Sequence, residues 1–80
     1  MNETEIRAVV TDVVAGVLTL PTEQVPPQAR FYDDLGGDSL QKLEIVAHIE
    51  SRFNCSLTHE QVAVSDTVED LCRQVARHVA

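Results

Sequence analysis

Two apolar stripes at helical spacing, one near each end of the chain, constrain its fold more than any other feature. Near the N-terminus the stripe recurs at i, i+3, i+4, i+7, i+8 and i+11, and consists of Ile6, Val9, Val10, Val13, Val14 and Val17. The C-terminal stripe consists of Val68, Leu71, Cys72, Val75, Ala76 and Val79. Valine favours strands, but strict alternation is absent, so both stretches are predicted to be helices.

Two more helices are predicted between these stripes. One begins at Ser39, with Asp38 as its N-cap, and stops at Asn54, which tolerates the left-handed conformation. Its predicted inner face consists of Leu40, Leu43, Val46, Ala47, Ile49 and Phe53, with Ile45 beside them. The other is short and spans Thr58–Val64, where the first residue caps and Gln61 completes a capping box.

Polar residues also mark the starts of the outer helices. Asn2 is predicted to cap the first helix, with Glu5 three residues later. Asp66 is predicted to cap the last helix, with Glu69 as its partner.

The connection between the first two long helices is unusually long. Pro21, Pro26 and Pro27 disfavour regular structure from about residue 19 to residue 38, apart from one turn near Thr22–Val25. Its apolar residues are predicted to pack on the core, and they are Leu18, Leu20, Val25, Phe31 and Leu35. The chain is therefore predicted to be all-α: a small antiparallel four-helix bundle with a long first loop and a short third helix, forming one domain over residues 1–80.

Charge and composition exclude several classes of function. The net charge of −7 repels nucleic acid and anionic membranes and attracts basic partners. No apolar run approaches the ~20 residues of a membrane span, and the acidic N-terminus is unlike a signal peptide, so a cytoplasmic protein is expected. The two cysteines, Cys55 and Cys72, do not make a disulfide framework.

One serine, Ser39, lies at the N-terminus of the second long helix. It lies in the sequence Asp33-Asp34-Leu35-Gly36-Gly37-Asp38-Ser39-Leu40, with no histidine close by to activate it. The serine is therefore interpreted as a hydroxyl presented for another enzyme to modify. An attached phosphate would lie beside unpaired amides at the positive end of the helix, and the paired glycines leave the backbone open to approach.

In residue order and setting this segment resembles the attachment site of acyl and peptidyl carrier proteins, and the resemblance extends from the first helix to Val79. It implies that Ser39 receives 4'-phosphopantetheine from coenzyme A, with Asp38, Gly37 and Leu40 around it. It also implies a monomeric carrier without catalytic activity. The implied partners are a phosphopantetheinyl transferase and loading or processing enzymes (a ketosynthase, an acyltransferase or an adenylation enzyme).

The resemblance also suggests further site residues. Leu40, Lys42 and Glu44 are expected to contact partners, although Leu40 equally fits a buried helix position. Residues that line an acyl chain tucked into the bundle are expected to be Phe31, Leu43, Val46, Ile49, Val62 and Val68. Plain core packing is the competing interpretation for this set.

The pathway is a separate question. The second long helix has two acids and two bases, which departs from the acidic helix of fatty acid synthesis carriers, whereas the double glycine is common in polyketide and peptidyl carriers. A discrete carrier of a polyketide or mixed polyketide–nonribosomal peptide pathway is favoured, since the chain starts with Met1 and ends at a helix terminus. A fatty acid synthesis carrier, a peptidyl or aminoacyl carrier, and an excised domain stay open.

Three rival functions are weighed against the carrier. The acids at 33, 34 and 38 lack the spacing of a calcium loop, and Cys55, His59, Cys72 and His78 lack the paired spacing of a zinc site, so no metal is expected. Serine hydrolysis would need a histidine, but His48 lies nine residues along the helix from Ser39, about 13 Å away. An unmodified helical protein-interaction domain is the third rival.

Overall fold

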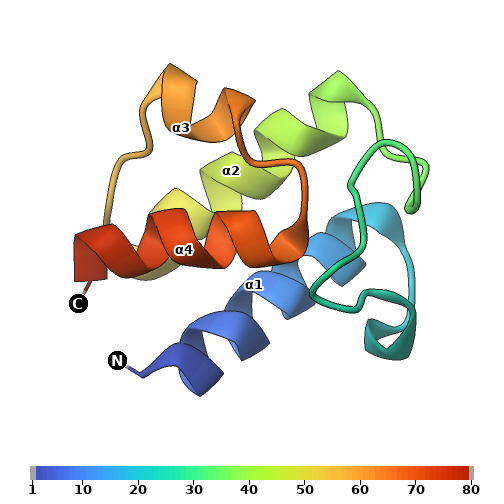
Figure 1. Cartoon of the computed structure of the whole chain (residues 1–80), viewed down its shortest axis with the longest axis horizontal. Helices are drawn as coiled ribbons and strands as arrows, with labels where there is room; N and C mark the ends of the chain where they lie inside the picture. The colour runs from blue at the N-terminus through green and yellow to red at the C-terminus, as the bar shows by residue number, and fades with distance from the viewer. Residues whose placement is uncertain (1, 80) are drawn as a thin grey trace.

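The structure is a computed structural model, and it describes residues 2–79; Met1 and Ala80, the ends of the predicted domain, lie outside the described residues. Its elements are α1 (Glu3–Leu18), the 3₁₀ turn η1 (Thr22–Gln24), α2 (Ser39–Phe53), α3 (His59–Ala63) and α4 (Val68–Val79). In Figure 1, α2 and α4 both run back against the direction of α1, and the short α3 connects them. The prediction of an all-α fold with four helices, one of them short, is confirmed.

The predicted caps of three helices are confirmed. Asn2 accepts a hydrogen bond from the amide of Glu5 at 2.8 Å, and Thr58 and Gln61 make both bonds of a capping box at the start of α3. α2 ends at Asn54 in the left-handed conformation, with φ of 51°. Each boundary therefore follows from local hydrogen bonding that the sequence encodes.

The cap of α4 lies one residue later than predicted. Thr67 Oγ1 accepts from the amide of Asp70, and the Asp70 carboxylate accepts from the amides of Thr67 and Asp66, each at 3.1 Å. The prediction that Asp66 caps α4 with Glu69 as its partner was wrong. A spacing of three residues fits this pair and the pair of Thr67 with Asp70 equally well, so the sequence alone did not decide between them. The backbone of residues 66 and 67 is held by the long connection, which selects the second pair.

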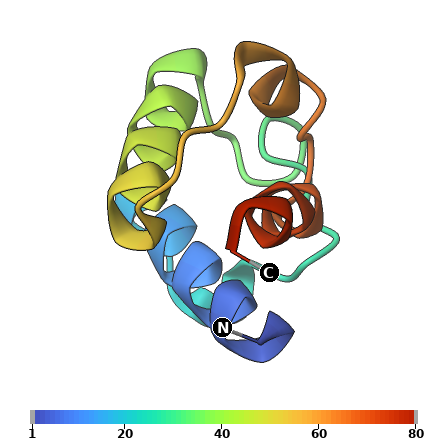
Figure 2. The ribbon, with the colours of Figure 1, turned by 90° about the vertical axis from the view of Figure 1, so that its left-hand side faces the viewer.

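Helix α1 is the centre of the packing. It lies against α2, α4 and η1, whereas the pairs among α2, α3 and α4 approach each other at fewer points. Figure 2 shows α2 above α1 on the left and α4 above it on the right, with α3 farther away. Ile6, Val10 and Val14 of α1 are buried in the main core cluster, so the predicted apolar face of α1 is the face around which the bundle assembles.

The inner face of α2 differs from the predicted one. Its buried residues are Lys42, Ile45, Val46, Ile49 and Phe53. Leu40 and Leu43, predicted to face inward, are 67% and 63% exposed, and Ala47 is exposed as well. The helix has two apolar stripes, and packing against α1 buries the one that contains Ile45.

The long connection packs on the bundle as predicted. Val25 and Phe31 are buried, while Leu18, Leu20 and Leu35 are partly buried against the core. Backbone hydrogen bonds fasten it to the start of α4, because the amide of Glu69 donates to Pro27 O at 2.9 Å and the amide of Phe31 donates to Asp66 O at 2.8 Å. The loop is thereby fixed at its middle, and the segment that leads to α2 starts from a rigid point.

Candidate functional site

Ser39 is the first residue of α2, and its side chain is exposed. The preceding Asp38 is the N-cap: its carboxylate accepts from the amide of Gln41 at 2.8 Å, and its own amide donates to the Gln41 side chain at 3.1 Å. In Figure 1 this first turn of α2 lies at the periphery of the bundle, where the long connection ends. The hydroxyl is therefore both accessible and mounted on a rigid helix start.

The backbone around Ser39 suits an attached phosphate. The first four amides of a helix have no partner within it. The capping box satisfies two of them, since the Asp38 carboxylate accepts from the amide of Gln41 and the Gln41 side chain accepts from the amide of Asp38. The amides of Ser39 and Leu40 have no such acceptor within residues 2–79. They point out of the positive end of α2, where an anion is stabilised.

The two glycines before Ser39 serve different purposes. Gly36 has φ of +69°, a conformation that glycine adopts without strain. At Gly37, a Cβ atom would overlap the ring of Phe31, and the amide of Gly37 donates to Phe31 O at 3.1 Å. We predicted that the missing side chain of Gly37 leaves room for an approaching enzyme, but the space is filled by Phe31.

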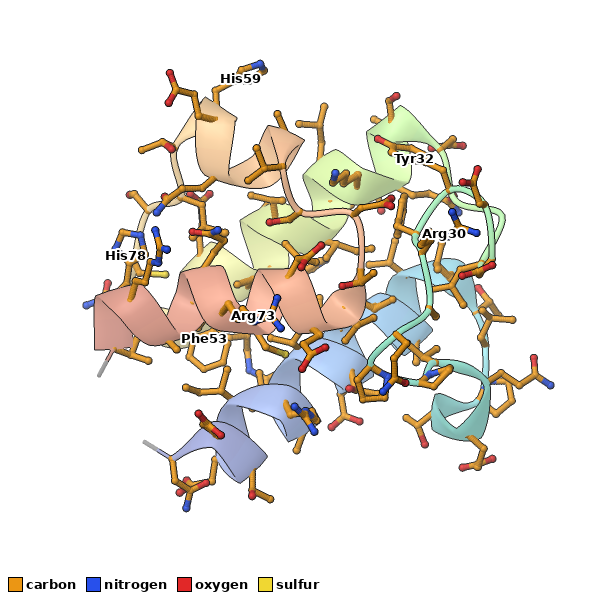
Figure 3. All side chains as sticks on the ribbon, viewed as in Figure 1. Arg30, Tyr32, Phe53, His59, Arg73 and His78 are labelled. Carbon is orange, nitrogen blue, oxygen red and sulfur yellow. The ribbon has the colours of Figure 1, made fainter. Side chains whose placement is uncertain are left out.

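Lys42, predicted as a partner contact, is buried instead, with only 7% of its surface exposed. Its Nζ lies 5.3 Å from the centre of the Tyr32 ring, which in turn packs edge-on against Phe31 with 5.1 Å between the ring centres. Figure 3 shows Tyr32 in the long connection beside the first turns of α2. Sequence reasoning missed Tyr32, although an aromatic residue before a helix that contains the chain's sole lysine was a usable signal.

The outer side of α2 offers two surfaces. Leu40, Leu43 and Ala47, at spacings of three and four, form an exposed apolar stripe that starts next to Ser39. Glu44, the other predicted contact, is exposed on the edge of a groove between α1 and α2. This groove has a volume of about 420 Å³ and is lined by Asp12, Val13, Gly16, Val17, Glu44, His48 and Arg52.

Most residues predicted to line an acyl chain lie inside the bundle. Phe31, Ile49 and Val68 belong to the main core cluster, Val46 is buried, and Val62 is half-buried. Leu43 does not join them because it faces outward. The fold therefore packs Phe31, Ile49 and Val68 together as ordinary core residues, whereas Val46 and Val62 lie outside this cluster.

The acids, cysteines and histidines considered for a metal site are either paired with an arginine or dispersed among different elements of the fold. Asp33 and Asp34 lie 3.6 Å from the Arg30 guanidinium, and within residues 2–79 no cluster of three or more His, Cys, Asp or Glu side chains is arranged to hold a metal ion. Cys55 and Cys72 are free thiols, and burial raises the pKa of both. In Figure 3, His59 and His78 lie on α3 and α4 at the end of the molecule opposite Tyr32.

No helix in the part of the chain that the structure describes is long and apolar enough to cross a membrane.

The site and fold match known proteins along nearly the whole chain. The family model described as "Phosphopantetheine attachment site" matches residues 8–75. The chain is 34% identical over 80 residues to an acyl carrier protein of Thermosynechococcus vestitus, covering 100% of this chain and 99% of the relative. It is 33% identical over 69 residues to an acyl carrier protein of Chlorobium luteolum, covering 86% of this chain and 88% of the relative.

Two solved structures share the fold. The acyl carrier protein of Enterococcus faecalis superimposes with a TM-score of 0.79 at 23% identity, covering 96% of this chain and 98% of the other. The HMG-ACPI domain of the CurA module from Lyngbya majuscula superimposes with a TM-score of 0.85 at 24% identity, covering 98% of this chain and 78% of the other. The bundle with a short third helix is thus the fold that these carriers share.

Proposed function

The chain belongs to the family of phosphopantetheine-binding acyl carrier proteins, and we propose that Ser39 is the residue to which the 4'-phosphopantetheine group is attached. The observation that carries this proposal is the exposed hydroxyl of Ser39 at the N-terminus of α2, next to a capping box and two unpaired amides. Members of this family carry intermediates and do not catalyse reactions on them.

The chain supplies only the accepting hydroxyl of Ser39, and a separate enzyme catalyses the attachment. A separate transferase directs the Ser39 oxygen to the phosphorus of coenzyme A that bears the pantetheine; an oxygen–phosphorus bond forms, the pyrophosphate bond breaks, and adenosine 3',5'-bisphosphate leaves. The hydroxyl proton passes to the transferase or to water. The attached group supplies a thiol that holds acyl intermediates as thioesters. The chain's own residues present the hydroxyl and stabilise the diester, with Asp38 holding the helix start in place.

Partner enzymes are proposed to dock on the exposed apolar stripe of α2. Leu40 and Leu43 lie within one turn of Ser39 and are 67% and 63% exposed, so an enzyme that reaches the arm covers them. The core of a protein interface is more apolar than its polar rim, so the two leucines are expected near the centre of the contact and the exposed Glu44 at its rim. The transferase and the acyl-processing enzymes are expected to share this surface, because every one of them acts on the same arm.

We further propose that residues 1–80 form a single, monomeric carrier domain that acts in the cytoplasm in polyketide or mixed polyketide–nonribosomal peptide biosynthesis. Support comes from α2, whose two acids, Glu44 and Glu50, are balanced by Lys42 and Arg52. A carrier of fatty acid synthesis is the alternative. Intact-mass measurement of the protein from its native host, followed by chemical identification of the released acyl group, distinguishes them, since β-branched or aminoacyl cargo supports the proposal and only straight saturated chains support the alternative.

Incubation with coenzyme A and a broad-specificity phosphopantetheinyl transferase tests the attachment site. We expect the wild-type protein to gain the mass of one phosphopantetheine, Ser39→Ala to gain none, and Ser51→Ala to gain it as the wild type does. Ser51 is the matched control because it is an exposed serine of the same helix. A mass gain that persists in Ser39→Ala, with peptide mapping to another residue, would contradict the proposal.

A further inference from the structure

The sole lysine of the chain buries its stem in the fold. Lys42 is only 7% exposed as a whole residue and makes no ion pair with any residue from 2 to 79, while its Nζ is not among the buried side-chain atoms that lack a partner, so the charged end reaches the surface. Its one polar contact is with the face of the Tyr32 ring, 5.3 Å from Nζ. The carboxylates of Asp33 and Asp34, the residues next to Tyr32, are both taken by Arg30. The ammonium is thus held in place but not neutralised.

The position of Lys42 relates it to the site. It lies three residues after Ser39 in α2, a spacing that puts two side chains on neighbouring positions of the helix surface, about 5–6 Å apart at their Cβ atoms. Side chains in a helix lean toward its N-terminus, so a lysine at this position covers the turn that begins with Ser39. Tyr32 lies in the connection at that same end of α2 (Figure 3).

We propose that Lys42 is a positioning residue for the prosthetic group, and that its ammonium pairs with the phosphodiester once this is attached to Ser39. The inference rests on the proposed attachment at Ser39. The diester adds one negative charge to a chain of net charge −7, directly beside the carboxylate of Asp38. A cation held close by offsets that repulsion, and the buried stem of Lys42 together with the contact of Nζ with the Tyr32 ring keeps it pre-positioned, so little side-chain entropy is lost when the pair forms.

This pairing gives the start of the arm a preferred direction. The two unpaired amides of the first turn contact the diester from the helix axis, and Lys42 contacts it from the side that faces Tyr32. The apolar stripe that begins at Leu40 and Leu43 is left free for partner enzymes.

A thermodynamic cycle tests the role of Lys42. The folding equilibrium constant is measured by urea unfolding for the unmodified and the phosphopantetheine-bearing forms of wild type, Lys42→Met and Lys42→Arg. Methionine keeps the apolar stem and removes the charge. We expect attachment of the group to change the folding constant about threefold to tenfold more favourably in the wild type than in Lys42→Met, and Lys42→Arg to keep most of that difference.

Arg52→Met is the matched control, because it removes one positive charge from the same helix at an exposed position remote from Ser39. Attachment of the group should change the folding constant of Arg52→Met by the same factor as that of the wild type. Equal effects in wild type and Lys42→Met would overturn the inference while leaving the attachment at Ser39 intact. If the wild type gains no phosphopantetheine mass at Ser39, the proposed function fails, and the role of Lys42 fails with it.

A measurement on the wild-type protein covers the case in which Lys42→Met does not fold. Because the chain has one lysine, selective ¹³C labelling gives a single lysine Cε resonance. We expect the Cε resonance to shift when the group is attached. We also expect the ³¹P resonance of the diester to shift when salt is raised to screen the pair. A Cε resonance that is unmoved by attachment would overturn the inference.

Discussion

A methyl group added at position 37 and one added at position 16 meet opposite surroundings. At Gly37 it would overlap the Phe31 ring, whereas at Gly16, in the last turn of α1, it would have no atom within 4 Å. Gly16 also has an ordinary helical conformation, so its flexibility only adds entropy to the unfolded chain. The contrast makes the two glycines a matched pair for measuring how tightly the loop before Ser39 is packed.

Gly37→Ala is expected to lower the free energy of unfolding by about 1–3 kcal/mol, because the ring of Phe31 must be displaced from its place in the core. Gly16→Ala is expected to raise the free energy of unfolding by about 0.5–1 kcal/mol. Urea unfolding of the unmodified protein followed by circular dichroism measures both. A neutral Gly37→Ala would show that Phe31 is not held against the loop.

For single residues, the sequence predicted the part of the site that local hydrogen bonding determines. Asp38 and Ser39 were placed correctly as cap and first helical residue, because the capping pattern is encoded within four residues. Lys42 was not, since the burial of a lysine depends on Tyr32 in the preceding loop, ten residues earlier in the sequence. The contact between Gly37 and Phe31 was missed for the same reason.

Among the elements, α4 begins with a hydrogen-bonded carboxylate. Burial alone would raise the pKa of Asp70, but hydrogen bonds from the amides of Thr67 and Asp66, from the Thr67 hydroxyl, and the nearby Arg73 charge outweigh it and lower the pKa below its ordinary value. A carboxyl group with a lowered pKa stabilises the folded state above its pKa in the unfolded chain, about 3.9. That contribution is lost as the pH falls through the lower pKa of the folded state.

Asp70→Asn should therefore be less stable than the wild type at about pH 6, and the gap in the free energy of unfolding should narrow as the pH falls below about 3.9. Urea unfolding at several pH values measures the gap. Asp66→Asn is the matched control, because it removes a neighbouring charge and keeps the backbone amide that donates to the Asp70 carboxylate. A pH-independent gap for Asp70→Asn would mean that the hydrogen bonds of the carboxylate do not favour its charged form.

Helix α2 shows where prediction from periodicity ends. Leu40, Leu43 and Ala47 recur at helical spacing just as Ile45, Ile49 and Phe53 do, so the sequence contains two stripes that could each face the core. Only contact with α1 and Phe31 decides between them, and these contacts are far away in sequence. In α1 and α4 a single stripe exists, and there the predicted and observed buried faces agree.

The whole molecule is small relative to the range of its own electrostatic field. Its extents are 29 × 25 × 19 Å, and its net charge is −7. The screening length is about 30 Å at 0.01 M salt and about 10 Å at 0.1 M, so at low salt acids on opposite sides of the molecule repel each other. Such repulsion destabilises the compact state.

Raising sodium chloride from about 0.01 M to about 0.1 M is accordingly expected to raise the free energy of unfolding of the unmodified protein. Glu60→Lys, at an exposed position of α3, brings the net charge two units closer to zero and should show a smaller response. Thermal or urea unfolding across the salt series measures it. A response of opposite sign would indicate that the exposed ion pairs, such as Arg73 with Asp70, outweigh the general repulsion.

Phe31 links the core of the bundle to the loop that precedes Ser39. Its ring packs in the core among the residues expected to surround cargo, its amide is bonded to Asp66 before α4, and its carbonyl and ring hold Gly37, two residues before Ser39. A displacement of this ring would therefore move Gly37, and with it the approach to Ser39.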